Sequence, residues 1–403
     1  MGVVFLSLEK RQVIVVGAGP SGLLSAREAS KRGVEVLVLE EHPEVGIPCH
    51  CAGLLSLNGL ERLKIPIDHS YVQNMVRGAI FYSPSGLSLR IERDRPVACV
   101  VNRSLFDKFL AFQAERAGAE IRLNCKVYGI SVDGIGVHVC SKPDRFMAEI
   151  LIDAEGVSSR LVRAAGLEPL NSSCLLSALQ FDLSGVSVDP EYVEVHLGRQ
   201  VAPGFFAWLI PLSSDSVRVG LGCKRANPRI LLNRFIQRRF KDEEYEILAV
   251  RSGTIVTSGP IRRTFADRLL IVGDAAGQVK PTTGGGVILG GICGMTAGRV
   301  AAEAVRLSRF NSDFLVSYER IWRGMLGREF RYMLWARRIL NALSDRMIDK
   351  LFEFIKREDL CRVISKLGDM DFQSRVISEL IHHGRILKML THLLGLGKPQ
   401  ING

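Results

Sequence analysis

The N-terminal part of the chain alternates between apolar runs and a segment of helical composition. Gln12–Val16 is rich in β-branched residues, residues 21–32 have a helical composition, and residues 34–39 form a second apolar run that ends at Glu40. Two short apolar runs joined by such a segment are typical of a βαβ unit with parallel strands. We therefore expect the chain to begin with a Rossmann-like unit.

The middle of the chain is rich in strand patterns, and its C-terminal part is helical. Residues 175–222 form a β-rich stretch punctuated by glycine and proline, and Leu269–Val272 has the pattern of a buried strand. Over residues 313–396 the apolar spacing follows one face of successive helices. Ser104 is placed to cap a helix over residues 105–118.

These patterns predict an α/β (α+β) fold in three parts. A discontinuous Rossmann-like domain comprises residues 10–170 and 250–310. A substrate-side β-sheet domain over residues 171–249 is inserted into it, and residues 311–403 form a C-terminal helical region.

Composition and charge narrow the functional classes. Hydrophobic residues make up 47% and charged residues 24% of the 403 residues, as in ordinary globular proteins. The formal net charge of +11 suits a nucleic acid, an anionic membrane surface or an acidic substrate, and charge alone does not choose among them. Because no other feature points to nucleic acid, we expect no nucleic-acid partner.

The nine cysteines are scattered along the chain and do not predict a disulfide framework, which fits a reducing cytoplasm. Cys49 and Cys51 form a C-x-C pair without a second pair or a histidine cluster, so we expect no bound metal. The longest stretch with few charges, residues 281–308, is glycine-rich and interrupted by charged residues, so we do not expect it to span a membrane.

The strongest candidate for chemistry is the glycine loop of the first βαβ unit. Gly17, Gly19 and Gly22 form the pattern G-x-G-x-x-G directly after a strand and at the start of a helix. Gly17 permits the tight turn, Gly19 lets the backbone approach a pyrophosphate, and Gly22 lets the helix pack closely on the strand. The helix N-terminus adds free N–H groups and a positive dipole. The alternative is a glycine-rich turn without a ligand.

Glu40 stands at the end of the second strand, 18 residues after Gly22. A carboxylate in this place can accept hydrogen bonds from a ribose diol, and its charge would repel a 2′-phosphate. The loop therefore predicts an adenine dinucleotide other than NADP.

Two later motifs favour FAD over NAD in this site. Leu151–Arg160 reads L-I-D-A-E-G-V-S-S-R, and Leu269–Gly277 reads L-L-I-V-G-D-A-A-G. Asp274 follows a buried strand, where a carboxylate can bind a ribityl hydroxyl. The glycine-rich turn Thr283–Gly286 can bring backbone N–H groups to the flavin or to phosphate. The alternative for Asp274 is a helix N-cap.

These three motifs in this order resemble the flavoprotein superfamily of aromatic hydroxylases, over residues 12–300. Two further segments and the last motif look like the geranylgeranyl reductase family: G-I-P-C-H-C-A-G-L-L-S at Gly46–Ser56, G-F-F-A-W-L-I-P at Gly204–Pro211 with G-L-G at Gly220–Gly222, and G-D-A-A-G-Q-V-K-P-T-T-G-G-G from Gly273. In that family, reduced FAD hydrogenates isolated double bonds of isoprenoid chains. The resemblance thus implies an FAD-dependent reductase of archaeal-type membrane phospholipid synthesis.

The resemblance also implies which residues contact FAD. The contact of Val127 is implied by its position in the chain alone, whereas every other contact is implied by a residue that matches a family motif. The implied contacts are Ser21, Glu40, Cys51, Ala52, Leu54, Arg103, Val127, Asp274, Gly286 and Val287.

The chain departs from the family pattern on the substrate side. Where the family often has Tyr-x-Trp-x-Phe-Pro, this chain has Phe206, Trp208, Ile210 and Pro211; where it has Cys-Gly-Glu-Gly, this chain has residues 51–54, C-A-G-L. These changes make the pocket more apolar, which suits a prenyl chain but removes polar anchors and proton donors.

Phe206, Trp208 and Pro211 are the candidate substrate residues. Phe206 and Trp208 lie two apart on a predicted strand and so share one face, where they could line a lipid tunnel beside the flavin. The alternative is ordinary sheet core. We hypothesise that Cys51 is a catalytic residue that tunes the flavin or relays a proton; the alternative is a buried structural cysteine.

The leading hypothesis is reduction of prenyl double bonds, with electrons from NAD(P)H or a ferredoxin-like protein. An aromatic monooxygenase and a flavin electron carrier without its own organic substrate are the alternatives. Residues 318–346 carry seven arginines against three acids between apolar residues, which suits an anionic membrane surface, or else a solvated helix packed on the flavin domain. We expect a cytoplasmic protein, or one peripheral on the cytoplasmic membrane.

Overall fold

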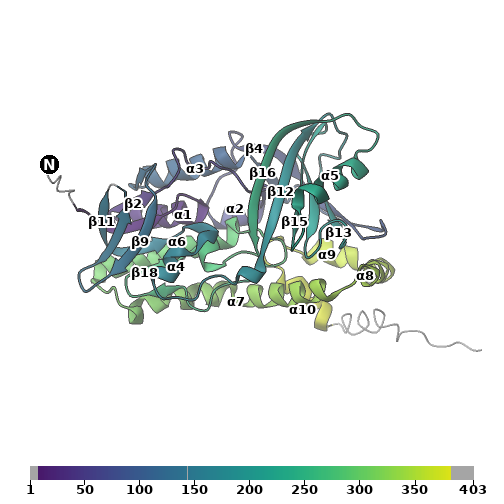
Figure 1. The fold of residues 1–403 in the computed structure, drawn as a ribbon. Helices are drawn as coiled ribbons and strands as arrows, with labels where there is room; N and C mark the ends of the chain where they lie inside the picture. Colours follow the sequence, from purple (N-terminus) through teal and green to yellow (C-terminus); the bar gives the residue numbers. More distant parts are fainter. Residues whose placement is uncertain (1–7, 143, 383–403) are drawn as a thin grey trace, which may run out of the picture.

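The computed structural model describes residues 8–142 and 144–382 of the chain. Two large β-sheets lie side by side, and helices of the C-terminal part run along both (Figure 1). The predicted α/β (α+β) fold with a Rossmann-like unit is confirmed.

The first sheet has eight strands, in the order β17-β18-β11-β1-β2-β8, with β10 and β9 following from β11. The strands from β18 to β8 are parallel, as expected for strands linked by helical crossovers. Apolar residues of β1 alternate between two core clusters, so both faces are covered. The strands are β1 (Glu9–Val16), β2 (Val36–Leu39), β8 (Glu120–Arg122), β9 (Val127–Val132), β10 (Val137–Ser141), β11 (Arg145–Asp153), β17 (Phe265–Ala266) and β18 (Leu269–Ile271).

Three helices cover one face of this sheet and belong to one core cluster with its strands. They are α1 (Pro20–Ser30), α3 (Arg103–Arg116) and α6 (Val287–Leu307). Glycines of α6 allow a close approach to α1, because a Cβ at Gly294 would lie 2.3 Å from the Ser21 carbonyl oxygen. α6 is long and apolar enough to cross a membrane, but 78% of its most apolar window is buried inside the protein, as in the core helix of a globular domain.

The second sheet has seven strands in the order β16-β12-β15-β14-β13-β5-β6. It takes strands from three separate parts of the sequence, since β13 pairs in parallel with β5. The inserted segment over residues 171–249 therefore supplies only part of the sheet. Its strands are β5 (Gly78–Tyr82), β6 (Ser88–Glu92), β12 (Leu175–Ser184), β13 (Tyr192–Leu197), β14 (Phe206–Pro211), β15 (Ser216–Cys223) and β16 (Glu246–Val256), and α5 (Pro228–Arg239) packs on it.

A small sheet is formed by β3 (Leu54–Ser56), β7 (Ala98–Val101) and β4 (Val72–Val76), whose strands come before and after β5 and β6 in the sequence. The prediction that Ser104 caps the third helix is wrong. α3 begins at Arg103, two residues before the predicted start, and Asn102 Oδ1 accepts hydrogen bonds from the N–H groups of Ser104 and Leu105. The short helices are α2 (Leu57–Arg62), α4 (Arg160–Ala164), η1 (Gly156–Ser158), η2 (Ser172–Cys174) and η3 (Gly273–Ala276).

The C-terminal part is helical as predicted, within the described residues. α7 (Ser312–Ala342) runs along both large sheets (Figure 1). It is followed by α8 (Asp345–Arg357), α9 (Leu360–Leu367) and α10 (Ser374–His382). The end of the predicted helical stretch, residues 383–396, lies outside the described residues.

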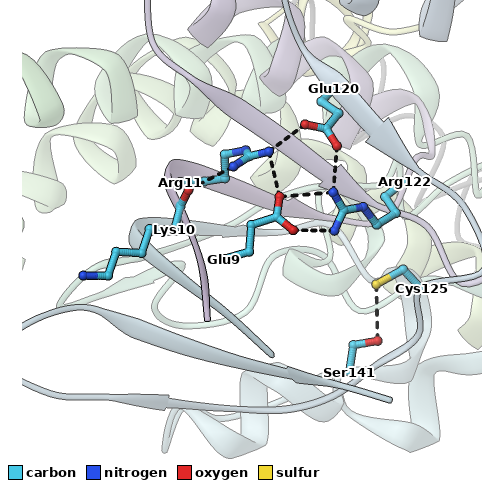
Figure 2. A network of polar contacts seen from close by, with 7 residues as sticks. All are labelled: Glu9, Lys10, Arg11, Glu120, Arg122, Cys125 and Ser141. Carbon is cyan, nitrogen blue, oxygen red and sulfur yellow. Dashed lines mark hydrogen bonds and ion pairs between the residues drawn. The ribbon is translucent and has the colours of Figure 1, made fainter. Parts of the chain in front are cut away.

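A ring of ion pairs joins β1 to β8 (Figure 2). Glu9 pairs with Arg11 and Arg122, both at 2.6 Å, and Glu120 pairs with the same arginines at 2.7 and 2.8 Å. All four side chains are 25–47% exposed. Because solvent screens such pairs, each contributes about 0–1 kcal/mol to stability.

Candidate functional site

The strand register brings the predicted motifs to one edge of the first sheet. The carboxyl ends of β2, β1, β11 and β18 are adjacent, since Val16 is paired with both Leu39 and Asp153, and Asp153 with Ile271. The glycine loop, Glu40, the turn after Asp153 and Asp274 all follow these ends directly. Open α/β sheets bind ligands at this edge.

The glycine loop has the geometry that its pattern predicts. Gly17 has φ +100°, and a Cβ there would lie 2.4 Å from the Ala154 carbonyl oxygen. A Cβ at Gly22 would lie 2.1 Å from the Gly17 carbonyl oxygen, whereas a Cβ at Gly19 would meet nothing within 4 Å. Gly19 is the N-cap of α1 and supplies no side chain to the first-turn N–H groups. The side of the loop next to Gly19 is thus shaped for a pyrophosphate.

Glu40 is bound to the glycine loop itself. Its Oε2 accepts a hydrogen bond from Ala18 N at 2.8 Å, and its Oε1 accepts one from His42 N at 3.0 Å. The His42 ring also lies 2.6 Å from Oε1. A carboxylate has further acceptor sites, so these bonds orient Glu40 without using up its capacity for a ribose diol.

Asp274 lies in η3, opposite the glycine-rich turn before α6. Its Oδ1 is 2.8 Å from the place where a Cβ at Gly286 would stand. The residue at the N-cap position of η3 is Val272, so the helix-cap alternative for Asp274 has no support. Burial raises the pKa of Asp274 and Arg103 opposes this rise. Within the described chain its carboxylate has no hydrogen-bond donor, which leaves it available to a ligand hydroxyl.

Ser21, Val287 and Val127 surround these motifs. Ser21 Oγ is 2.7 Å from the place of a Cβ at Gly273, which puts the first turn of α1 against η3. Val287 begins α6 directly after Gly286. The side chain of Val127 is buried in the core cluster of the opposite sheet face, and its FAD contact stays a prediction.

Arg103 connects the motifs to the cysteine segment, which we define as residues 46–56. Its guanidinium forms two hydrogen bonds to Asp107, at 3.0 and 2.9 Å, and its side chain is 11% exposed. Burial lowers the pKa of Arg103, but Asp107 and the nearby Cys51 and Cys49 have a larger opposite effect, so the pKa is raised overall. Arg103 also acts electrostatically on Asp274. Three residues predicted to contact FAD, from three distant segments, therefore share one neighbourhood: Cys51, Arg103 and Asp274.

The cysteine segment is held through its backbone by the second sheet. Arg218 Nη1 donates to the Ala52 carbonyl at 2.8 Å, and Gln180 Nε2 donates to the Cys51 carbonyl at 3.1 Å. The Cys51 thiol accepts a hydrogen bond from Gly53 N at 3.4 Å. Burial raises the pKa of the neighbouring Cys49 thiol, with Arg103 opposing. The orientation of Cys51 is thus set by side chains of β12 and β15.

Arg218 belongs to a buried charge cluster that was not singled out from the sequence. Its guanidinium binds Asp182 at 2.8 and 3.0 Å, and Arg251 binds the same carboxylate at 2.6 Å. Burial raises the pKa of Asp182, but the two arginines outweigh it and lower the value. The signal in the sequence was a single charge inside each of two apolar strand patterns, which a buried partner requires.

The candidate substrate residues divide between two faces of β14. Phe206 and Trp208 share a face, with ring centroids 6.1 Å apart, and Trp208 packs in one cluster with Ala52 and Leu54 of the cysteine segment. The indole Nε1 of Trp208 is buried without a hydrogen-bond partner. Pro211 points to the opposite face by strand alternation and is not brought together with them.

The C-terminal region reaches the site through a second buried ion pair. Lys280, which precedes the glycine-rich turn, binds Asp371 at 2.7 Å, and Ser56 donates a hydrogen bond to the same carboxylate. Thr282 Oγ1 donates to Gln373 Oε1 at 3.0 Å. Asp371 thus links the glycine-rich turn to the cysteine segment, which no local pattern predicts.

Residues 8–142 and 144–382 contain no group of three or more His, Cys, Asp and Glu side chains that could hold a metal ion. All nine cysteines lie in these ranges and are free thiols.

Comparisons with known proteins agree with this geometry. Residues 10–290 match the FAD binding domain family. The chain is 36% identical, over 89% of its length and 95% of the relative's, to digeranylgeranylglycerophospholipid reductase 2 of Methanothermobacter thermautotrophicus. It is 33% identical to digeranylgeranylglycerophospholipid reductase of Methanocaldococcus jannaschii, over 85% and 89% of the two chains.

Solved structures show the same fold. A geranylgeranyl bacteriochlorophyll reductase-like protein of Thermoplasma acidophilum superimposes with a TM-score of 0.83 at 28% identity, covering 93% of this chain and 100% of that one. The halogenase PltM in complex with phloroglucinol and FAD has a TM-score of 0.70 at 16% identity, over 96% and 93% of the chains, which shows the fold alone. The predicted cofactor, FAD, is confirmed, and the chain belongs to the geranylgeranyl reductase family of FAD-binding oxidoreductases.

Proposed function

We propose that this protein reduces isolated double bonds in the geranylgeranyl chains of glycerophospholipids, in archaeal-type membrane lipid synthesis. The observation that carries the proposal is the apolar wall of Phe206 and Trp208 packed against the cysteine segment, in a chain whose curated relatives are named digeranylgeranylglycerophospholipid reductases.

An isolated alkene has no carbonyl that a protein can polarise. The protein must therefore hold the double bond in place and keep water out, while reduced FAD supplies the hydride. Phe206 and Trp208 provide apolar surface for this. Glu40, Asp274 and the glycine loop would hold the dinucleotide, and Arg103 and the Arg218–Asp182 pair would keep the cysteine segment beside it.

Cys51 remains the candidate for delivering the proton or tuning the flavin. The support is its place beside Arg103 and its position in a segment that the second sheet holds. A Cys51→Ala variant that keeps its FAD and its full rate of alkene reduction would exclude the catalytic role. A Cys49→Ala variant serves as the matched control, because Cys49 is two residues away and not proposed to act.

The decisive experiment is anaerobic incubation of chemically reduced protein with digeranylgeranylglycerophospholipid. We expect the lipid mass to rise in steps of one hydrogen molecule. If the reduced protein leaves every prenyl lipid unsaturated, an electron carrier is favoured instead. Oxidation of NADPH stimulated by a phenol would favour an aromatic monooxygenase. Comparing NADPH, NADH and reduced ferredoxin as electron sources then identifies the donor class.

We also propose that the outer face of α7 lies on an anionic membrane surface. Ile321, Met325 and Trp335 are 47%, 47% and 39% exposed, and they follow one stripe of the helix. Three exposed arginines, Arg320, Arg331 and Arg338, lie along one side of this stripe. Two of the three acids of α7 face inward, since Glu319 accepts from Thr264 N and Glu329 from Ser374 N, whereas Asp313 is exposed. Trp322 and Phe330, by contrast, are buried against the flavin domain.

Co-sedimentation with vesicles tests this surface and the proposed peripheral location. We expect binding to vesicles that contain anionic lipid at low salt, and little binding to neutral vesicles. Met325→Glu should reduce the binding, and Glu303→Lys, on the surface of α6, should not. Equal sedimentation of both variants with anionic vesicles would contradict the membrane surface.

A further inference from the structure

One arginine of α7 differs from its neighbours. Arg337 faces inward and is 6% exposed, whereas Arg331 and Arg338 on the same helix are exposed. Within the described chain no carboxylate lies within ion-pair distance of Arg337. The other arginine buried to this degree in the site, Arg218, has Asp182 as its counter-charge.

The contacts of Arg337 leave part of its guanidinium unsatisfied. Nη2 donates to the Gly204 carbonyl, the guanidinium carbon lies 4.6 Å from the centroid of the Phe205 ring, and Nε is buried without a partner. Burial lowers the pKa of Arg337 to about 10, so the side chain stays positively charged at neutral pH. A cation with unused N–H donors is therefore held at the junction of α7 and β14.

A buried charge without a counter-charge is destabilising. An anionic ligand would remove this penalty. Arginine suits phosphate in particular, because its planar fork can form two parallel hydrogen bonds to the oxygens.

Phe205 places this cation next to the candidate site. Its ring stacks on Phe206, with centroids 4.2 Å apart, and Phe206 contacts Trp208. Phe205 Cζ also lies 3.7 Å from the place of a Cβ at Gly284, in the glycine-rich turn. Arg337 is thus one ring away from both the proposed prenyl wall and the turn beside Asp274.

We propose that Arg337 binds the phosphate of a prenylated glycerophospholipid substrate. The phosphate lies at the Arg337 guanidinium, and the prenyl chain extends along Phe206 and Trp208. This inference rests on the proposed function, because it assigns the polar end of the same substrate.

The test compares two lipids and two variants. Chemically reduced protein is assayed in detergent micelles with digeranylgeranylglycerophosphate and with the matching alcohol that lacks the phosphate. For the wild type we expect kcat/KM to favour the phosphate-bearing lipid at least about tenfold, the value of one charge-assisted bidentate contact. Arg337→Met should remove this preference by raising KM for that lipid alone, and Arg337→Lys should restore part of it. Arg338→Met is the matched control and should keep the preference.

Binding is measured separately from turnover, by the quenching of tryptophan fluorescence with saturated forms of both lipids and with inorganic phosphate. Preferential binding of the lipid phosphate supports the inference even if neither unsaturated lipid is reduced, an outcome that would reject the proposed function alone. The inference is overturned if the wild type treats both lipids alike, if Arg337→Met weakens both equally, or if inorganic phosphate binds as tightly as the lipid. The wild-type comparison decides the matter even if Arg337→Met fails to fold.

Discussion

The two ends of the candidate site are built by different physical means. At the glycine-loop end, the backbone packs so closely that the distances exclude any side chain at Gly17 and Gly22, and the Glu40 carboxylate accepts a hydrogen bond from Ala18 N. At the cysteine-segment end, residues 46–56 are held by buried charges from other parts of the chain, Arg218 with Asp182 and Lys280 with Asp371. Apart from the approach of Gly17 to Ala154, this close packing lies within one βαβ unit, whereas each buried ion pair needs two remote segments to meet.

The largest effect is expected from Gly22→Ala. The new Cβ would lie 2.1 Å from the Gly17 carbonyl oxygen, so α1 cannot keep its place. We expect loss of bound FAD and destabilisation of about 1–3 kcal/mol or more. Gly19→Ala is the matched variant, because its Cβ meets no protein atom within 4 Å. It should keep the melting temperature of the FAD-free protein but weaken FAD binding, measured by titration; unchanged FAD affinity would contradict the pyrophosphate role of Gly19.

The cysteine-segment end is tested by Asp182→Asn. This change leaves Arg218 and Arg251 without their shared carboxylate, and we expect a loss of about 3–5 kcal/mol in the free energy of unfolding. Cys51 should also react faster with a thiol reagent, as mapped by mass spectrometry, since its segment loses its anchor. Arg11→Met in the exposed ring of Figure 2 is the control and should cost about 0–1 kcal/mol. Equal losses of unfolding free energy in the two variants would show that the buried Asp182 cluster stabilises the protein no more than the exposed ring does.

The link to the C-terminal region is tested by Asp371→Asn. The variant leaves the Lys280 ammonium buried without its counter-charge, so we expect a loss of about 3 kcal/mol and a changed visible spectrum of the bound flavin. The double variant Lys280→Met with Asp371→Asn should be more stable than the single one, because it removes both charges. If the double variant lost as much stability as the two single changes added together, Lys280 and Asp371 would not interact across the site.

The smallest expected effect is on the stability of the protein at acidic pH. Burial raises the pKa of Glu194 in β13, but hydrogen bonds from His196 and Arg239 outweigh it and lower the pKa from 4.5 to about 2. A lowered folded-state pKa contributes stability above pH 4.5 that is lost as the pH falls towards 2. We expect Glu194→Gln to remove on the order of 2 kcal/mol of this pH-dependent stability, measured by urea unfolding. If the wild type and Glu194→Gln had the same dependence of unfolding free energy on pH, another group would be responsible for the loss of stability in acid.

Much of the glycine-loop end could be predicted from the sequence. The order strand, G-x-G-x-x-G, helix, strand, acid is contiguous, and each part reports its own local conformation. Asp274 was also found, since its glycine-rich surroundings follow a buried strand. What could not be predicted was that the Glu40 carboxylate binds Ala18 N, because a hydrogen bond across the loop depends on how two strands are paired.

The cysteine-segment end was predicted only in part. Cys51 and Arg103 came from a resemblance, but Arg218, Asp182 and Asp371 were missed. Each of these charges lies far along the chain from its partner, and β5 and β6 join a sheet whose other strands begin some 80 residues later. Periodicity reports which face of a strand is apolar, not which strand will be its neighbour.

The sequence by itself determined the Rossmann-like unit, the FAD motif order and the family, because these depend on local conformation and on the spacing of residues within short segments. Only the tertiary structure decided which side chains hold Cys51, how the C-terminal region reaches the site through Asp371, and that Arg337 is buried without a counter-charge. These features arise from contacts between remote segments, and their energies exist only once burial has removed the charges from water.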